Sequence, residues 1–237
     1  MTAPQHSLNW YRARLGKITG SSVGKIYGRG RGAEFSKTGY TYLNGVAGER
    51  MIPRDVVNDD IFFTQYVDET STSSKAMRIG SEREGEARTL YSILFDVEVE
   101  ETGCTAHPTI DGFASSPDGL VGADGVLEIK CPSPGVYMEY LTSVKTPSDL
   151  RSYNSEYFWQ CVSHLMCTGR QWCDFVVYCP YNNSPLHRIR IEAQPEYFRD
   201  LKPRIISAIK YINSILPEEY HIELKEEAPD EATEKAA

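Results

Sequence analysis

The segment of residues 116–130, SPDGLVGADGVLEIK, constrains the chain more than any other part of its sequence. Asp118 follows a proline and precedes a Glu-x-Lys triplet that contains Glu128 and Lys130. Residues i and i+2 of a β-strand point to the same face, so the carboxylate of Glu128 and the ammonium of Lys130 project together. The oxygens of Asp118 and Glu128 suit a hard divalent cation. A cation beside a lysine suits phosphodiester hydrolysis, because it binds phosphate oxygens and favours a hydroxide-like water.

The flanking residues predict that Asp118 and Glu128 come together on a β-hairpin. Residues 125–131 alternate between apolar and polar side chains, residues 111–116 resemble the end of a partner strand, and the glycines between them predict a turn. The alternative is a surface hairpin in which Asp118 is an ordinary turn residue and Glu128 and Lys130 form a solvated pair. The apolar neighbours of these charges favour a buried strand whose charged side chains face a cleft.

Length and composition indicate one globular domain. The chain has 237 residues, of which 41% are hydrophobic and 24% are charged. We expect a single domain over residues 1–225 and a disordered acidic tail over residues 226–237. No apolar run approaches the length of a membrane span, and the first residues have no signal-peptide core, so we expect a cytoplasmic protein.

The charge is distributed unevenly along the chain. The net charge is −8, yet residues 1–40 are mostly basic in their charged side chains, and residues 218–237 are mostly acidic. A DNA enzyme needs a local positive surface rather than a positive total, so this distribution is compatible with DNA binding. The alternative is that the basic residues lie on a solvated helix and loop. The basic residues are Arg12, Arg14, Lys17, Lys25, Arg29, Arg31 and Lys37.

The cysteines recur at an interval that invites a metal interpretation. Cys161, Cys167, Cys173 and Cys179 are six residues apart. No C-x-x-C pair occurs, and the interval crosses a predicted helix and then a strand, which argues against a zinc or iron–sulfur site. We expect reduced, buried thiols that pack as small hydrophobic side chains.

The periodicity of apolar residues predicts an α/β domain with a mixed sheet between helices. A polar loop is expected over residues 53–75, and residues 135–152 are expected to be irregular or helical. Helices are expected at residues 8–15, 40–51, 76–95, 153–167 and 195–216, and strands at 97–106, 111–116, 125–131, 172–179 and 187–191.

Five sequence blocks in a fixed order now identify a resemblance. They are WYRARLGKITGS (10–21), GSEREGEAR (80–88), SPDGL (116–120), LEIKCP (127–132) and Gln160 in the following helix. The chain resembles the phage lambda exonuclease family, the YqaJ-type viral recombinases, within the PD-(D/E)XK nuclease superfamily. The resemblance extends from about residue 8 to at least residue 180.

This resemblance implies a restriction-endonuclease-like core, with a mixed central sheet flanked by helices, and a defined activity. Enzymes of this family degrade one strand of linear duplex DNA from the 5′ end with Mg²⁺ or Mn²⁺, using two ions per active site. They release mononucleotides and leave a 3′ overhang for a single-strand annealing protein. Several are ring-shaped trimers, so we expect a homotrimer in a bacterial or phage-infected cell.

The resemblance also assigns the catalytic residues. It implies that Asp118, Glu128 and the backbone carbonyl of Ile129 bind metal, and that Lys130 orients or activates the attacking water. Glu84 is expected to assist at the metal site.

Two further assignments come from the same resemblance. Gln160 is expected to contact the water or the lysine. Arg14, Ser21 and Ser116 are expected to hold the terminal 5′ phosphate, with Ser115 as a further donor.

Several alternatives stay open at this stage. Within nucleases, the chain fits a PD-(D/E)XK endonuclease or a RecB-like nuclease module. Outside them, it fits a DNA-binding relative without catalysis. We expect His107 and His164 to have structural or incidental roles, because two-metal phosphodiester cleavage does not need histidine.

Overall fold

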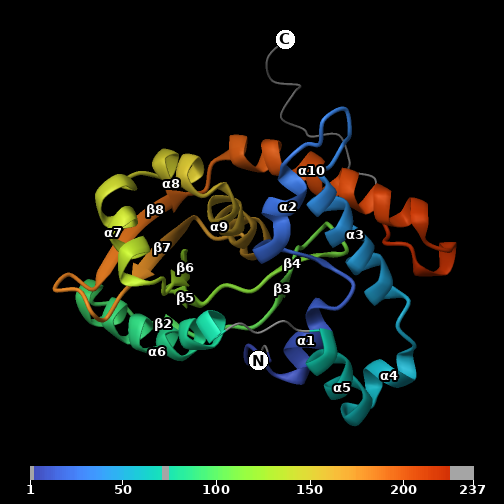
Figure 1. Ribbon diagram of the computed structural model, residues 1–237, viewed down its shortest axis with the longest axis horizontal. Coiled ribbons are helices and arrows are strands. Elements are labelled where there is room, and N and C mark those ends of the chain that lie inside the picture. The colour runs from blue at the N-terminus through green and yellow to red at the C-terminus, as the bar shows by residue number, and fades with distance from the viewer. Residues whose placement is uncertain (1–2, 71–74, 225–237) are drawn as a thin grey trace.

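The computed structural model describes residues 3–70 and 75–224, without the side chains of residues 75–82 (Figure 1). The acidic tail expected over residues 226–237 lies outside the described residues. The helices are α1 (Leu8–Arg14), η1 (Gly20–Ser22), α2 (Val23–Tyr27), α3 (Lys37–Arg50), α4 (Arg54–Asn58), α5 (Asp60–Thr70), α6 (Lys75–Phe95), α7 (Pro134–Ser143), α8 (Pro147–Tyr153), α9 (Ser155–Thr168), α10 (Pro195–Ile215) and η2 (Glu218–Tyr220). The strands are β1 (Ile18–Thr19), β2 (Val99–Glu100), β3 (Thr105–Ala106), β4 (Phe113–Ser115), β5 (Gly119–Val121), β6 (Gly125–Lys130), β7 (Trp172–Tyr178) and β8 (Leu186–Glu192).

The larger of two sheets has five strands. Its strand order is β2-β5-β6-β7-β8, and the pair β6–β7 is parallel while the other pairs are antiparallel. The chain crosses from β6 to β7 through α7, α8 and α9, as a parallel connection requires. The mixed sheet between helices that the sequence predicts is therefore confirmed.

A second, three-stranded sheet has the order β1-β4-β3. Its strands are two or three residues long, and β1 pairs in parallel with β4. This sheet connects the N-terminal residues to the segment that leads into Asp118. The expected hairpin between residues 111–116 and 125–131 is wrong, because β4 belongs to this second sheet and the hairpin partner of β6 is β5.

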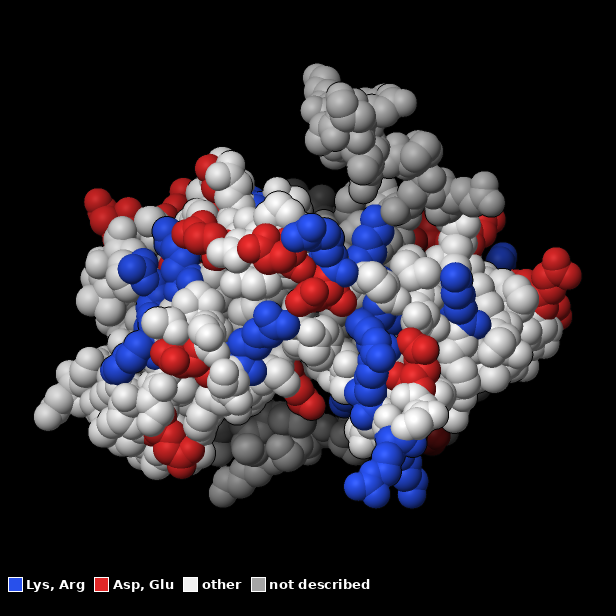
Figure 2. Space-filling view, turned by 90° about the horizontal axis from the view of Figure 1, so that it is seen from above, with Lys and Arg blue, Asp and Glu red and all other residues white. Residues whose placement is uncertain are grey.

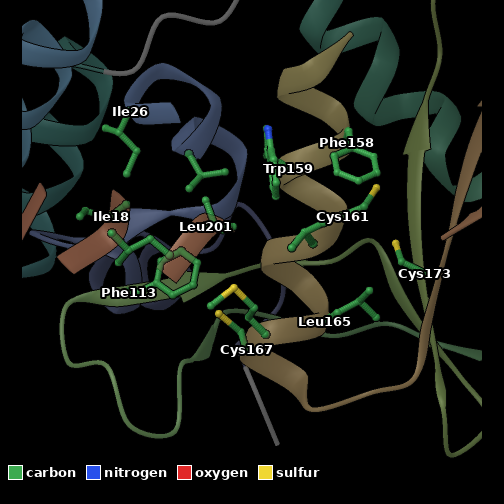
Figure 3. Close-up of a cluster of buried hydrophobic side chains, with 14 of the residues drawn as sticks. Ile18, Ile26, Phe113, Phe158, Trp159, Cys161, Leu165, Cys167, Cys173 and Leu201 are labelled. Carbon is green, nitrogen blue, oxygen red and sulfur yellow. The ribbon is translucent and has the colours of Figure 1, made fainter. Parts of the chain in front are cut away.

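Helix α9 lies in the core beside the five-stranded sheet. The Asn154 side chain accepts a hydrogen bond from Tyr157 N at its start, and Gly169 ends it with a φ of 68°. Every residue from Phe158 to Cys167 is buried, so the helix contacts protein on all sides. Figure 3 shows Cys161, Cys167 and Cys173 among apolar side chains, as expected for thiols that pack as hydrophobic residues.

The two faces of β6 are buried by different helices. Val126 packs in the large core cluster with α9, whereas Leu127 and Ile129 pack in a smaller cluster with α6. Because side chains alternate along a strand, Glu128 and Lys130 face the α9 side with Val126. Helix α6 covers the opposite face of the same sheet (Figure 1).

A buried ionic network fastens α6 to this sheet. The Asp174 carboxylate on β7 is fully buried and accepts a hydrogen bond of 2.6 Å from the Tyr91 hydroxyl on α6. Arg190 on β8 donates two further bonds to the carboxylate, at 2.7 and 2.9 Å. The negative charge of Asp174 is thus compensated, which its burial requires.

The loop expected over residues 53–75 is also wrong in its described part. Residues 54–58 form α4 and residues 60–70 form α5. Phe63 and Val67 are buried from α5, four residues apart on one face of the helix. Residues 71–74, where serine and threonine are concentrated, lie outside the described part of the chain.

The surface seen in Figure 2 carries both signs of charge. Lysine and arginine side chains alternate with acidic ones over this face rather than forming one continuous basic area. Within the described residues, no helix combines the length and the apolar character needed to cross a membrane.

We expect Tyr91→Phe to lower the free energy of unfolding by about 1.5–3 kcal/mol, because it removes a hydrogen bond to a buried carboxylate. Chemical denaturation measures this change. Tyr211→Phe is the matched control, since its hydroxyl bonds Asn44 at the surface, and we expect a change within about 0.5 kcal/mol. Equal effects of both substitutions would contradict the role of Asp174 in fastening α6.

Candidate active site

Asp118 lies directly before β5 and is held by three main-chain contacts. Its amide donates to the carbonyl of Leu127 at 2.9 Å, and its carboxylate Oδ2 accepts from the amide of Ile129 at 2.6 Å. The Arg88 guanidinium on α6 donates to the carbonyl of Asp118 at 2.5 Å and pairs with Glu101 at 3.1 Å. The structure therefore brings Asp118 beside Glu128, as the sequence predicts.

Glu128 uses its two carboxylate oxygens for two different partners. Oε1 lies 2.5 Å from the Lys130 Nζ, and Oε2 lies 2.7 Å from the His164 Nε2 on α9. The carboxylate is only 1% exposed, whereas the Lys130 side chain is 26% exposed and reaches toward solvent. The Lys130 ammonium also lies 4.9 Å from the centre of the Tyr157 ring. The predicted same-face pair of Glu128 and Lys130 is confirmed.

Burial and mutual repulsion determine the charge states in this cluster. Burial, with the negative charges of Glu128 and Glu84, raises the pKa of Asp118 well above its usual value. Burial alone would raise the pKa of Glu128, but the Lys130 charge and the His164 hydrogen bond outweigh it and lower that pKa. Burial alone would lower the pKa of Lys130, but the charges of Glu128 and Asp118 raise it. The lysine is therefore held as a cation.

Glu84 and Gln160 lie at the same cluster. Burial, followed by the charge of Glu128, raises the pKa of Glu84, which places this α6 carboxylate within electrostatic reach of the site. Gln160 is buried on α9, one turn before His164 and on the same face of the helix. Glu84 is thus electrostatically linked to Glu128, whereas the roles of Glu84 and Gln160 at a metal site stay predictions.

The donor set fits a divalent cation. Glu128 Oε1 is buried and accepts no hydrogen bond beyond its ion pair with Lys130. Burial and the charges of neighbouring carboxylates raise the pKa of Asp118 and of Glu84. A hard cation favours such oxygens. Among the described residues, no group of three His, Cys, Asp or Glu side chains forms a complete cage. Mg²⁺ does not need one, since it usually takes one or two carboxylates and completes its shell with water and phosphate oxygens.

A second polar cluster forms around Ser116, two residues before Asp118. The Ser116 Oγ accepts from Arg14 Nη1 at 2.9 Å and from Trp10 Nε1 at 3.1 Å. Arg14 Nη2 reaches Ser21 Oγ at 3.2 Å, and its guanidinium stacks 4.2 Å from the Trp10 ring. The structure thus brings Arg14 and Ser21 together with Ser116, which lies 102 positions after Arg14 in the sequence.

This cluster has the chemistry of an anion site. Because Ser116 Oγ accepts two N–H groups, its own hydroxyl proton is available for another acceptor. A cavity of about 250 Å³ opens beside Arg14; Lys17, Thr19 and Glu49 also line it, whereas Ser21 and Ser116 are not among its lining residues. Burial lowers the pKa of Arg14, which indicates that its charge is partly removed from water. An arginine in that state, with serine hydroxyls beside it, suits a phosphate.

Ser115 does not belong to this cluster, contrary to the expectation that it is a further phosphate donor. Its side chain is fully buried, and its Oγ lies 2.7 Å from the Nδ1 of His164. The hydroxyl therefore faces α9 rather than the cavity beside Arg14.

Sequence reasoning gave no site role to His164, Trp10 or Arg88. His164 follows Gln160 by four residues, and this spacing on one helix was the available signal. Trp10 lies in the first of the sequence blocks without a role of its own, yet it holds Ser116 and Arg14. Arg88 lies in one of the sequence blocks, but its bond to the backbone of Asp118 depends on the docking of α6.

We expect Gly20→Ala to destabilise the protein by about 1–3 kcal/mol, because the added Cβ would lie 2.2 Å from Ser115 Oγ in a packed core. Thermal or chemical denaturation measures the change. Gly28→Ala is the control, since nothing lies within 4 Å of its Cβ position, and we expect a change within about 0.5 kcal/mol. A Gly20→Ala variant as stable as the Gly28→Ala variant would contradict this packing.

Comparisons with known proteins agree with this geometry. A family model, the YqaJ-like viral recombinase domain, matches residues 9–171. The alkaline exonuclease LHK-Exo from Laribacter hongkongensis is 30% identical, with a TM-score of 0.71 over 88% of this chain and 93% of the other. The same exonuclease in complex with dAMP gives 29% identity and the same TM-score. A phage-related exonuclease from Haemophilus somnus 129PT shares the fold at 14% identity, with a TM-score of 0.61 over 84% and 94% of the two chains.

A search of curated proteins gave no match. The structural relatives confirm the restriction-endonuclease-like core, and the nuclease family implies a divalent metal ion. The chain belongs to the YqaJ-like viral recombinase family, and it is a nuclease of the lambda exonuclease type.

Proposed function

We propose that the chain is a metal-dependent exonuclease that degrades one strand of linear duplex DNA from 5′ to 3′. In this proposal it releases mononucleotides and leaves a 3′ overhang. The observation that carries the proposal is the short connection between two sites: Ser116 contacts Arg14, and Asp118, two residues later, contacts the amide of Ile129 beside Glu128. An anion site for a terminal phosphate and a carboxylate site for the scissile phosphate thus share one segment of chain.

The carboxylates of Asp118 and Glu128 and the carbonyl of Ile129 are the proposed metal ligands, with Glu84 assisting. Mg²⁺ or Mn²⁺, two ions per site, would neutralise the scissile phosphate and lower the pKa of a bound water. The support is the gathering of buried carboxylates: burial, followed by the charges of the neighbouring carboxylates, raises the pKa of Asp118 and of Glu84.

Lys130 is the proposed partner of the attacking water. Its ammonium is held at Glu128 and is partly exposed, so it can orient a water against the phosphate without leaving its ion pair. Gln160 is buried on α9, four residues before His164, and is proposed to hold the same water. Arg14, Ser21 and Ser116 hold the terminal 5′ phosphate in this proposal, which fixes which bond reaches the carboxylates.

The biological setting belongs to the same proposal. We place the enzyme in the cytoplasm of a bacterial or phage-infected cell, as a homotrimeric ring around the duplex. A single-strand annealing protein would take over the 3′ overhang for recombination. The support is membership of the recombinase family, together with exonucleases as structural relatives.

We expect Asp118→Asn and Lys130→Ala to lower digestion of linear duplex with Mg²⁺ by at least about 100-fold. Asp118→Asn removes one charge from a repelling cluster, so the metal-free protein should be no less stable than the wild type. Timed digestion of end-labelled linear duplex, with a nicked circle in parallel, measures rate, polarity and product size.

The same assay separates the alternatives. An exonuclease consumes only the linear DNA, an endonuclease also cuts the circle, and a binding protein only retards both. Wild-type digestion rates in Asp118→Asn, or release of labelled 3′ ends first, would contradict the proposal.

We expect Arg14→Ala to slow digestion of 5′-phosphorylated ends by about 10- to 100-fold relative to 5′-hydroxyl ends, because it removes charged hydrogen bonds to the phosphate. Arg12→Ala is the control from the same helix, since Arg12 contacts Asp60 and the carbonyl of Val57 instead. The ratio of rates on the two ends cancels any loss of folded protein. An equal loss on both ends in Arg14→Ala would remove its role at the phosphate.

A further inference from the structure

A buried chain of hydrogen bonds leads from the second sheet to Glu128. Ser115 Oγ on β4 lies 2.7 Å from His164 Nδ1, and His164 Nε2 lies 2.7 Å from Glu128 Oε2 on β6. All three side chains are 1% exposed or less. Helix α9 thus connects the two sheets through one imidazole ring, and the ring ends on a proposed metal ligand.

The chemistry of the partners fixes the direction of these bonds. A carboxylate only accepts hydrogen bonds, so the Nε2 of His164 carries a proton and donates it to Glu128. In the neutral ring Nδ1 is then an acceptor, and the Ser115 hydroxyl donates to it. Glu128 therefore selects the tautomer, and Ser115 supplies the second hydrogen bond that holds the ring in place, as the second partner of a ligand-orienting histidine does.

The position of the ring is itself tightly determined. Helix α9 is buried on all sides around His164, and the Cβ position of Gly20 lies 2.2 Å from Ser115 Oγ. Close packing therefore restricts the movement of both the His164 ring and the Ser115 side chain. Oε2 of Glu128 is held by the ring, which leaves Oε1 toward Lys130 and without another hydrogen bond. Oε1 is the oxygen that a cation can take.

We propose that His164 is a positioning residue, which fixes the rotamer of Glu128 so that Oε1 is presented to the metal ion. This inference rests on the proposed role of Glu128 as a metal ligand. Loss of a partner that orients a metal ligand typically lowers metal affinity by about 10- to 100-fold. The rival explanation is that His164 only fills the core, in which case metal affinity would not depend on its bond to Glu128.

Two amide substitutions separate these explanations. The longer side chain of His164→Gln extends its amide nitrogen toward the place of Nε2, so it can still donate to Glu128. The shorter side chain of His164→Asn reaches only the place of Nδ1, so it can bond Ser115 but not Glu128. Both variants replace a ring by an amide in the same core, so packing losses are similar. His187→Ala is a further control, because it removes a hydrogen-bonded histidine at β8, which bonds the carbonyl of Val144.

The experiment is calorimetric titration of Mn²⁺ into each folded protein without DNA, with thermal unfolding in parallel. We expect His164→Asn to weaken Mn²⁺ binding by about 10- to 100-fold, and His164→Gln and His187→Ala to stay within about threefold of the wild type. Ser115→Ala, which keeps the ring but loses its partner, should fall between them. Should His164→Asn not fold, the Mn²⁺ affinity of Ser115→Ala is compared with those of the wild type and His164→Gln. Weaker binding in Ser115→Ala than in both then supports the inference.

The outcomes are distinct. Equal Mn²⁺ affinity in His164→Asn and His164→Gln, with lowered thermal stability in both, would overturn the inference and leave His164 as a core residue. A wild-type protein that binds no Mn²⁺ would overturn it as well. A wild type that binds Mn²⁺, with weakened binding in His164→Asn, but digests no linear DNA would support the inference and refute the proposed exonuclease instead.

Discussion

The ion pair between Glu128 and Lys130 is the interaction on which the site depends. A buried carboxylate is strongly disfavoured unless it is paired and hydrogen-bonded, and Glu128 meets this condition through Lys130 and His164. Asp118 is less well compensated, since its charged partner is the same lysine, and its pKa is raised. The negative charge of the cluster is therefore incompletely compensated, which favours a bound cation. Uncompensated buried charge lowers the stability of the metal-free protein, so the presence of these carboxylates argues for a function rather than for folding.

The sequence predicts strand β6 well because each of its faces packs against a different helix, one against α9 and the other against α6. Alternation of apolar and charged residues is a local signal, and here it matches the burial of Leu127 and Ile129 against α6 and of Glu128 toward α9. The partner strand was assigned incorrectly because β4 and β5 are three residues long, too short for alternation to identify a sheet. Helix α5 was missed for another reason: although it has 11 residues, only Phe63 and Val67 are buried from it, so its apolar face is narrow.

The two halves of the candidate site differ in how far the sequence determines them. Asp118, Glu128 and Lys130 lie within one hairpin, so spacing and strand geometry suffice to bring them together. Arg14 and Ser116 are 102 positions apart in the chain, and only the resemblance to a family assigned them to one site. His164 was expected to be structural or incidental, and its contact with Glu128 was missed for a different reason. A helix buried on every side has no polar face, so its sequence does not reveal which residue meets the carboxylates.

The segment from Ser115 to Asp118 makes three different contacts, whose spacing is set by the geometry of its backbone. Ser115 points inward to His164, Ser116 points outward to Arg14, and Asp118 accepts the amide of Ile129. Two residues of chain span at most about 7 Å, so the distance between the proposed phosphate site and the metal ligands is set by covalent structure. Main-chain bonds to Leu127 and Arg88 hold the segment at its far end. In an enzyme that removes one nucleotide at a time, the position of the cut would then follow from the rigidity of this segment. A flexible loop between the two sites would leave the choice of bond undetermined.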